Sequence, residues 1–264
     1  MRVLPVPCLK DNYAYLVTGG GGAGPGGGAS GAIVVDPSEA APVEAALAEH
    51  GLTLEGIWLT HHHFDHVAGV EALCEAHPGL PVLGSAYDLD HARIPRQSRA
   101  LREGDALALH GHPVTVLEIP GHTLGAIAYV VDGCLFSGDT LFVAGCGRVF
   151  EGTMDMMQGS LAKLRALPAS TQLYCGHEYT VSNLRFAAAI EPASSAITAR
   201  AACARDLRER SKPTVPGTLA DELRTNPFLR WDAPDVVAAA RARGAQDDSP
   251  AQVFGALRKA KDTF

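Results

Sequence analysis

The sequence has no long hydrophobic run, no closely paired cysteines and no excess of basic residues. None of its apolar runs approaches the roughly 18 residues that a membrane-spanning helix needs. The segment Met1 to Pro5 lacks the apolar core and the small-residue cleavage site of a secretory signal, so we expect a cytoplasmic protein with no membrane partner. The formal net charge is −7, which makes an extended nucleic-acid-binding surface unexpected.

The six cysteines are scattered and show neither C-x-x-C spacing nor the density of a disulfide-stapled secreted domain. We therefore expect reduced thiols. Hydrophobic residues make up 47% and charged residues 19% of the 264 residues, which is ordinary globular usage. This length allows one large domain or two modest ones.

Apolar strands alternate with helical segments over the first two thirds of the chain. Strands are expected at 13–18, 32–35, 56–60, 80–83, 114–119, 127–131, 134–137 and 173–175, and helices at 40–50, 67–77 and 159–166. The glycine-rich stretch 19–31 is interpreted as a flexible hairpin loop, because no Gly-Lys-Ser/Thr follows to make it a phosphate cradle.

Strand signals nearly vanish after residue 179. Helices are expected at 183–210, 234–243 and 250–261. The fold class is therefore α/β (α+β), with one domain predicted at 1–178 and a helical domain at 179–264.

The densest polar cluster is the segment Thr60 to His66, which reads Thr-His-His-His-Phe-Asp-His and follows an apolar strand. Four imidazoles and a carboxylate are costly to gather in a core unless something satisfies their lone pairs, and a divalent cation does so. Loops after strands are also where α/β proteins place their sites. A solvated polar loop is the alternative, but the pattern favours a metal site.

Three further segments place a candidate ligand where an apolar strand gives way to a glycine-flanked turn. His122 follows the strand that ends at Ile119, Asp139 ends a predicted hairpin, and His177 ends the last strand of the first domain. A single histidine of this kind would more often be structural. Because the arrangement recurs along the chain, the segments together predict one site.

The spacing H-x-H-x-D-H from His61 to His66 resembles the signature of the metallo-β-lactamase superfamily. The resemblance implies an αββα metallo-β-lactamase-like sandwich with a smaller all-helical C-terminal domain. It also implies two divalent metal ions per chain. One would be held by His61, His63 and His122, the other by Asp65, His66 and His177, with Asp139 bridging both.

Imidazole and carboxylate ligands without thiolate suit zinc, the expected metal, with iron or manganese as alternatives. Three or four protein ligands per metal leave positions open for water, as in catalytic sites. Two such metals can lower the pKa of a shared water and polarise an acyl oxygen. Asp65 and Asp139 are the expected catalytic carboxylates, since a carboxylate on a metal can also orient that water.

Segments over nearly the whole chain resemble glyoxalase II, the hydroxyacylglutathione hydrolases. These segments are Lys10 to Tyr13, Gly145 to Arg148, Glu151 to Thr153, Cys175 to Thr180, Asn226 to Arg230 and Arg258 to Asp262. The resemblance implies that Arg148, Tyr179, Arg258 and Lys261 bind glutathione, whose carboxylates suit basic partners. The i, i+3 spacing of the last two residues places them on one helical face.

The implied reaction is hydrolysis of S-(2-hydroxyacyl)glutathione thioesters by a water activated between the two metals. A typical substrate is S-D-lactoylglutathione, which would yield glutathione and D-lactate in the second step of methylglyoxal detoxification. We expect a monomer whose partner is this small thioester. The sequence departs from the resemblance at Phe150, where the family often has tyrosine, so one hydroxyl contact would be missing.

Two other functions remain open at this point. A persulfide dioxygenase shares the expected fold and acts on glutathione persulfide, but it uses a single iron held by two histidines and a carboxylate. A non-catalytic metal-binding domain would instead fill every metal position with protein ligands. Counting the metals and testing for exchangeable water separates the three possibilities.

Overall fold

The computed structural model describes residues 1–19 and 30–264, which divide into two compact units. Unit 1 comprises Met1–Glu118 and Gly125–Gly138, and unit 2 comprises Ile119–Leu124 and Asp139–Phe264. These units divide the chain at other positions than the predicted domain boundary after residue 178, which stays a prediction. The loop predicted at 19–31 lies almost entirely outside the described residues.

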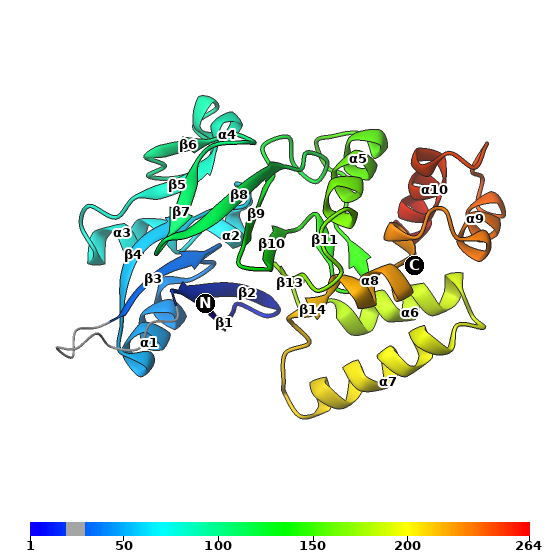
Figure 1. The fold of residues 1–264 in the computed structure, drawn as a ribbon, viewed down its shortest axis with the longest axis horizontal. Helices are drawn as coiled ribbons and strands as arrows, with labels where there is room; N and C mark the ends of the chain where they lie inside the picture. Colours follow the sequence, from blue (N-terminus) through cyan, green and yellow to red (C-terminus); the bar gives the residue numbers. More distant parts are fainter. Residues whose placement is uncertain (20–29) are drawn as a thin grey trace. The chain divides into compact units, whose positions relative to one another are not determined.

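Unit 1 contains a six-stranded sheet whose strands follow one another in sequence order (Figure 1). Its strands are β1 (Arg2–Cys8), β2 (Asn12–Thr18), β3 (Ser30–Val35), β4 (Leu52–Trp58), β5 (Val82–Ser85) and β6 (Arg99–Leu101). The first three pair antiparallel, and β3 to β6 pair parallel. β2 is buried along its whole length, as a strand covered on both faces must be.

Helices pack against this first sheet. The helices of unit 1 are α1 (Ala40–His50), α2 (Phe64–Val67), α3 (Val70–Ala76) and α4 (Ala86–Asp90). Leu47 of α1 and Leu73 of α3 are buried in one hydrophobic cluster with Leu16 and Ile57 of the sheet. Gly51 ends α1 with a left-handed φ of 60°, which glycine adopts without steric cost and which confirms the predicted helix end.

A second, antiparallel sheet in unit 1 faces the first. It contains β7 (Leu107–Leu109), β8 (His112–Glu118), β9 (Ile127–Val131) and β10 (Cys134–Gly138). The Tyr129 hydroxyl donates to the Leu59 carbonyl at 3.0 Å, and the Tyr129 ring lies 4.9 Å from that of Trp58. The hairpin predicted around Asp132 and Gly133 is confirmed, and both residues have the positive φ of a two-residue turn.

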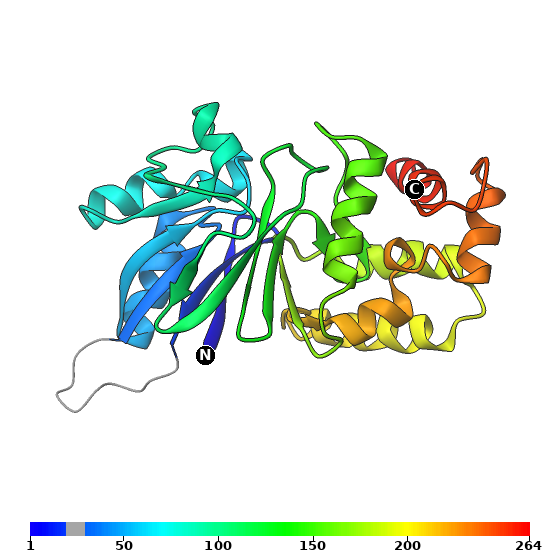
Figure 2. The same cartoon turned by 45° about the horizontal axis from the view of Figure 1, so that its top comes forward.

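Unit 2 is mostly helical, and α6 and α7 lie side by side within it (Figure 2). Its elements are β11 (Leu141–Phe142), β12 (Gly145–Cys146), α5 (Met154–Arg165), β13 (Gln172–Cys175), α6 (Thr180–Ile190), α7 (Ser195–Glu209), β14 (Gly217–Thr218), α8 (Leu219–Thr225), η1 (Pro227–Leu229), α9 (Pro234–Arg241) and α10 (Pro250–Asp262). β11 pairs with β12 and β13 with β14, both antiparallel.

The single helical stretch expected at 183–210 is wrong, because two helices occupy it. Pro192 supplies no backbone N–H donor, and α6 ends at Ile190. The Ser194 hydroxyl then accepts from the Ile197 backbone N–H and caps the start of α7. The elements β1, α4, β6, β7, β11, β12, α8 and β14 were also not predicted, most of them because they are too short to give a clear periodic pattern. Within residues 1–19 and 30–264, no helix has the length and apolar character needed to cross a membrane.

Candidate active site

The histidine segment of unit 1 follows the buried end of β4 and leads into α2. His61 and His66 are buried, and their rings lie 4.2 Å apart. The His61 Nε2 atom lies 3.2 Å from the Nδ1 atom of His63. Three of the predicted ligands therefore present ring nitrogens close to one another.

Asp36 organises this segment and was missed by the sequence analysis. It follows the buried strand β3, and its carboxylate accepts hydrogen bonds from the backbone N–H and the hydroxyl of Thr60 at 2.8 and 2.6 Å. Its Oδ2 also lies 3.1 Å from Nδ1 of His66. A carboxylate has no hydrogen to donate, so Nδ1 carries the proton and Nε2 keeps its lone pair for a metal. The available signal was a carboxylate directly after an apolar strand.

Asp65 and His62 occupy different surroundings. The Asp65 side chain is 41% exposed, and Asn12 donates from Nδ2 to its Oδ2 at 3.1 Å. His62, on a variable position of the signature, lies 2.6 Å from Nη2 of Arg93 and 3.5 Å from the buried Asp88 carboxylate. Because Asp65 is accessible whereas Asp36 is buried, Asp65 is the carboxylate better able to meet a substrate or a water.

Unit 2 brings together the other three predicted ligands, although they come from widely separated segments. The Asp139 Oδ2 atom lies 3.2 Å from Nε2 of His177 and 3.6 Å from Nε2 of His122. Nδ1 of His122 lies 2.8 Å from the backbone carbonyl of Arg148, which can only accept. Nδ1 therefore holds the proton, and Nε2 presents its lone pair beside the carboxylate.

The donor set in each unit fits the predicted metals. Imidazole nitrogens and carboxylate oxygens are ligands of zinc, iron and manganese, and the hydrogen bonds of His66 and His122 fix the tautomers that a metal requires. Potential ligand atoms of His61 and His66 lie within 4.8 Å of each other and of the Asp36 carboxylate, which supports the two histidines and is not among the predicted ligands. The assignment of the seven ligands to two metals stays a prediction.

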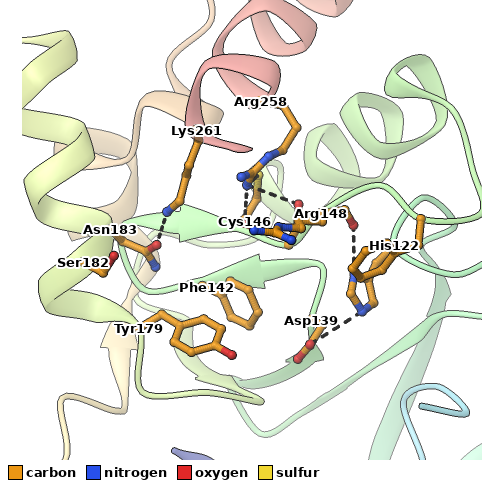
Figure 3. Close-up of a pocket in the computed structure, with 12 residues that line it drawn as sticks. His122, Asp139, Phe142, Cys146, Arg148, Tyr179, Ser182, Asn183, Arg258 and Lys261 are labelled. Carbon is orange, nitrogen blue, oxygen red and sulfur yellow. Dashed lines mark hydrogen bonds and ion pairs between the residues drawn. The ribbon is translucent and has the colours of Figure 1, made fainter. Parts of the chain in front are cut away.

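A cavity of about 490 Å³ opens beside His122 and Asp139 in unit 2 (Figure 3). This volume is within the usual range for small-molecule sites. Its wall is formed by His122, Asp139, Phe142, Cys146, Gly147, Arg148, Phe150, Tyr179, Ser182, Asn183, Arg258 and Lys261. All four residues predicted to bind glutathione are among them, although their roles stay predictions.

Those four residues differ in solvent exposure and in the contacts of their polar groups. Arg148 is 62% exposed, and its Nε lies 3.6 Å from Asp262. Arg258 is 2% exposed, and its Nη1 donates to the Cys146 carbonyl at 2.8 Å. Tyr179 is partly exposed and stacks on His177 at 4.7 Å between ring centroids. Arg148 and Tyr179 are therefore the more accessible pair, while Arg258 also holds the cavity wall together.

Lys261 is the most perturbed cation of the cavity. Burial lowers the pKa of its ammonium to about 8, and the positive charge of Arg258 acts in the same direction. Its Nζ donates to Oδ1 of Asn183, a cavity residue that the sequence analysis did not identify. The one available signal was the spacing of Asn183 from Tyr179, which is one helical turn.

A buried polar network holds the segment that carries Phe142 and Cys146. The Glu222 carboxylate accepts from the Ala144 backbone N–H at 2.8 Å and pairs with Arg200. Asn226 donates to the Gly145 carbonyl at 3.0 Å. Burial raises the pKa of Glu222, and the Arg200 charge opposes that shift. The cavity wall therefore rests on groups that are distant from it in sequence.

Comparisons with known proteins cover both parts of the chain. Residues 12–177 match the metallo-beta-lactamase superfamily, and residues 178–264 match the hydroxyacylglutathione hydrolase C-terminus. A hydroxyacylglutathione hydrolase of Cupriavidus taiwanensis is 48% identical over 277 residues, covering 100% of this chain and 99% of that protein. One of Alkalilimnicola ehrlichii is 49% identical over 264 residues, covering 99% and 98%.

A solved structure is also similar. The crystal structure of TTHA1623 in a di-iron-bound form has a TM-score of 0.58 and 28% identity, covering 87% of this chain and 100% of that chain. Together with the two family matches, this likeness confirms the predicted fold class.

Proposed function

We propose that this chain, which belongs to the metallo-β-lactamase superfamily and within it to the hydroxyacylglutathione hydrolase family, hydrolyses S-(2-hydroxyacyl)glutathione thioesters. S-D-lactoylglutathione is the typical substrate, and glutathione and D-lactate are its products. The full-length relatives favour this reaction over that of a persulfide dioxygenase, because both are named for the hydrolase activity.

One observation carries the proposal beyond family membership. The cavity of unit 2 is lined by two proposed metal ligands, His122 and Asp139. The basic side chains of Arg148 and Lys261 line the same cavity. A glutathione thioester has anionic carboxylates at its ends and a reactive carbonyl at its sulfur. A single cavity can therefore pair the carboxylates with cations while the carbonyl reaches the reacting groups.

The proposed ligands divide as the family signature implies. His61, His63 and His122 would hold one ion, Asp65, His66 and His177 the other, and Asp139 would bridge the two. The di-iron form of the similar TTHA1623 structure supports a two-metal site. When bound, two divalent cations supply a water of lowered pKa and polarise a carbonyl group. We propose zinc as the metal, with iron or manganese as alternatives.

The chain's own residues would orient the reaction. The exposed Asp65 carboxylate, held by Asn12, can accept a hydrogen bond from the attacking water and direct it toward the thioester carbonyl. Asp36 and the Arg148 carbonyl keep His66 and His122 in one tautomer. Arg148, Tyr179, Arg258 and Lys261 would bind the glutathione part. The departing thiolate is a good leaving group, so no general acid is required.

We also propose that the protein is a cytoplasmic monomer with the helical part at 179–264 contributing to glutathione binding. The six cysteines, all of which lie in described segments, are thiols, as a reducing compartment favours. A light-scattering mass in solution tests the oligomeric state.

The deciding experiment follows the thioester absorbance of S-D-lactoylglutathione with the purified protein. We expect turnover that a chelator abolishes and that added zinc restores, because the proposed water needs the metals. Asp139→Asn should remove activity, whereas Asp155→Asn, at an exposed position of α5, should leave it unchanged. Oxygen uptake with glutathione persulfide, together with one iron per chain and no thioester turnover, would overturn the proposal.

A further inference from the structure

Asn183 is a buried residue of the cavity wall whose amide joins two other wall elements. It lies on α6 and is 2% exposed. Its Nδ2 donates to the Val143 carbonyl at 2.9 Å, and its Oδ1 accepts from the Lys261 ammonium of α10 (Figure 3). One side chain therefore links the segment between β11 and β12 to the helix that carries the proposed glutathione-binding cation.

The orientation of this amide is determined by its partners. A backbone carbonyl such as that of Val143 can only accept a hydrogen bond, and an ammonium such as that of Lys261 can only donate one. Turning the amide over would place two acceptors together and two donors together, and both bonds would be lost. Asn183 therefore has one arrangement, with its oxygen toward Lys261.

The surrounding backbone leaves little room for another arrangement. A Cβ added at Gly145 would lie 2.5 Å from Cγ of Asn183, so glycine is needed for the backbone to pass this close. The Gly145 carbonyl is itself held by Asn226 at 3.0 Å. The amide is thus packed against a segment that other buried groups already fix.

The Lys261 ammonium lies among aromatic rings and ionisable groups, and the Asn183 oxygen accepts a direct hydrogen bond from it. Its Nζ lies 5.7 Å from the ring centroid of Phe186 and 5.9 Å from that of Phe228. The ionisable groups that act on it are Cys146 of β12 and Arg258 and Asp262 of α10. Burial, the largest effect, and the Arg258 charge lower the pKa of Lys261, whereas Cys146 and Asp262 raise it. The Asn183 oxygen accepts a hydrogen bond from the ammonium and so helps to hold this charge in place.

We infer that Asn183 is a positioning residue for substrate binding: anchored on the Val143 carbonyl, its amide oxygen holds the Lys261 ammonium in the cavity wall to meet an anionic group of the substrate. This inference rests on the proposed function. It assigns Asn183 an effect on affinity that passes through Lys261, with no contact to the reacting atoms.

A double-mutant cycle tests this role. Asn183→Leu removes both hydrogen bonds at nearly constant volume, Lys261→Met removes the charge, and the two are combined. Binding of S-methylglutathione, which cannot be hydrolysed, gives Kd, and turnover of S-D-lactoylglutathione gives KM and kcat. Lys259→Met, which removes an exposed charge from the same helix, is the matched control and should behave like the wild type.

We expect each single variant to raise Kd and KM about tenfold, with kcat changed less than about threefold. The double variant should be no more than about twofold weaker than Lys261→Met, because Asn183 has nothing left to position. The ratio of Kd values for Lys261→Met and wild type should be large below pH 8 and fall toward one above it, as Lys261 loses its proton. Asn183→Ser should show the same direction of change should the leucine variant fold poorly.

The inference would be overturned if the increase in Kd of the double variant equalled the product of the increases in the two single variants. So would an Asn183→Leu protein that loses thermal stability and kcat while its Kd stays at the wild-type value, since that pattern marks a structural role alone. Absence of thioester turnover in the wild type contradicts the proposed function instead. The binding titrations decide the role of Asn183 in either case.

Discussion

The histidine segment of unit 1 and the cavity of unit 2 are built in different ways. In unit 1 the candidate ligands come from one short stretch, His61 to His66, and the supporting Asp36 and Asn12 are side chains at the ends of neighbouring strands. In unit 2 the wall residues come from segments as far apart as His122 and Lys261. A local motif can therefore supply ligands with few supports, whereas a cavity drawn from distant segments needs a buried framework.

The two regions also orient their histidines by different groups. The Asp36 side chain orients His66, while a backbone carbonyl, that of Arg148, orients His122. A side-chain support can be removed by one substitution without disturbing the fold elsewhere. A backbone support moves only when the segment that carries it moves, so function and stability should be separable in unit 1 and coupled in unit 2.

The largest expected effect comes from breaking the framework of unit 2. Arg200→Met leaves the fully buried Glu222 carboxylate without its cation and should lower the free energy of unfolding by about 3–5 kcal/mol at neutral pH. Denaturant unfolding measures the change. Arg224→Met, in an exposed pair with Asp221, is the control and should cost less than about 1 kcal/mol.

The same variant has a pH signature. Burial raises the folded-state pKa of Glu222, so the folded protein binds this proton more readily than the unfolded chain. The contribution of Glu222 to the free energy of unfolding is then fully present below the pKa that Glu222 has in the unfolded chain. It is lost as the pH rises through the pKa that Glu222 has in the folded protein. The deficit of Arg200→Met should therefore shrink as the pH falls toward 4.5. A deficit that is equal at pH 7 and pH 5 would contradict this account.

The next effect sharpens the comparison from the side of unit 1. Asp36→Asn cannot accept from both Thr60 groups and also from His66, so we expect about 10- to 100-fold weaker metal binding with little loss of stability. Competition with a chelator measures metal affinity, and thermal unfolding of the metal-free protein measures stability. Asp90→Asn, at an exposed carboxylate of the same unit, should change neither quantity. Unaltered metal affinity in Asp36→Asn would remove the proposed role.

The smallest effect concerns the exposed cation of the cavity. Arg148→Met should raise KM for the thioester only about two- to fivefold, because a solvent-exposed charge contributes less than about 1 kcal/mol. The increase should diminish at high salt, which screens exposed charges. Arg210→Met, at the exposed C-cap of α7 and outside the cavity wall, serves as the control. A large loss of kcat would show instead that Arg148 acts on the reaction itself.

Much of the architecture followed from local patterns. Most of the longer strands and helices before residue 179, the Gly51 helix end and the Asp132-Gly133 hairpin were predicted, because side-chain periodicity and turn residues act over a few positions. The strand β1 and the short elements α4, β6 and β7 were not predicted. The break between α6 and α7 was missed even though Pro192 and Ser194 mark it. The alanine-rich composition on both sides favoured one continuous helix and outweighed these two residues.

The sequence by itself determined the family, the fold class and the identities of the candidate ligands and cations, since a fixed spacing of histidines and aspartate is a local property. Only the tertiary structure decided that Asp36 and Asn183 support them, that Arg258 is buried while Arg148 is exposed, and that Glu222 holds the cavity wall. The physical reason is that burial and hydrogen-bond partners depend on which distant segments meet. These contacts between distant segments cannot be predicted from residue spacing along the chain.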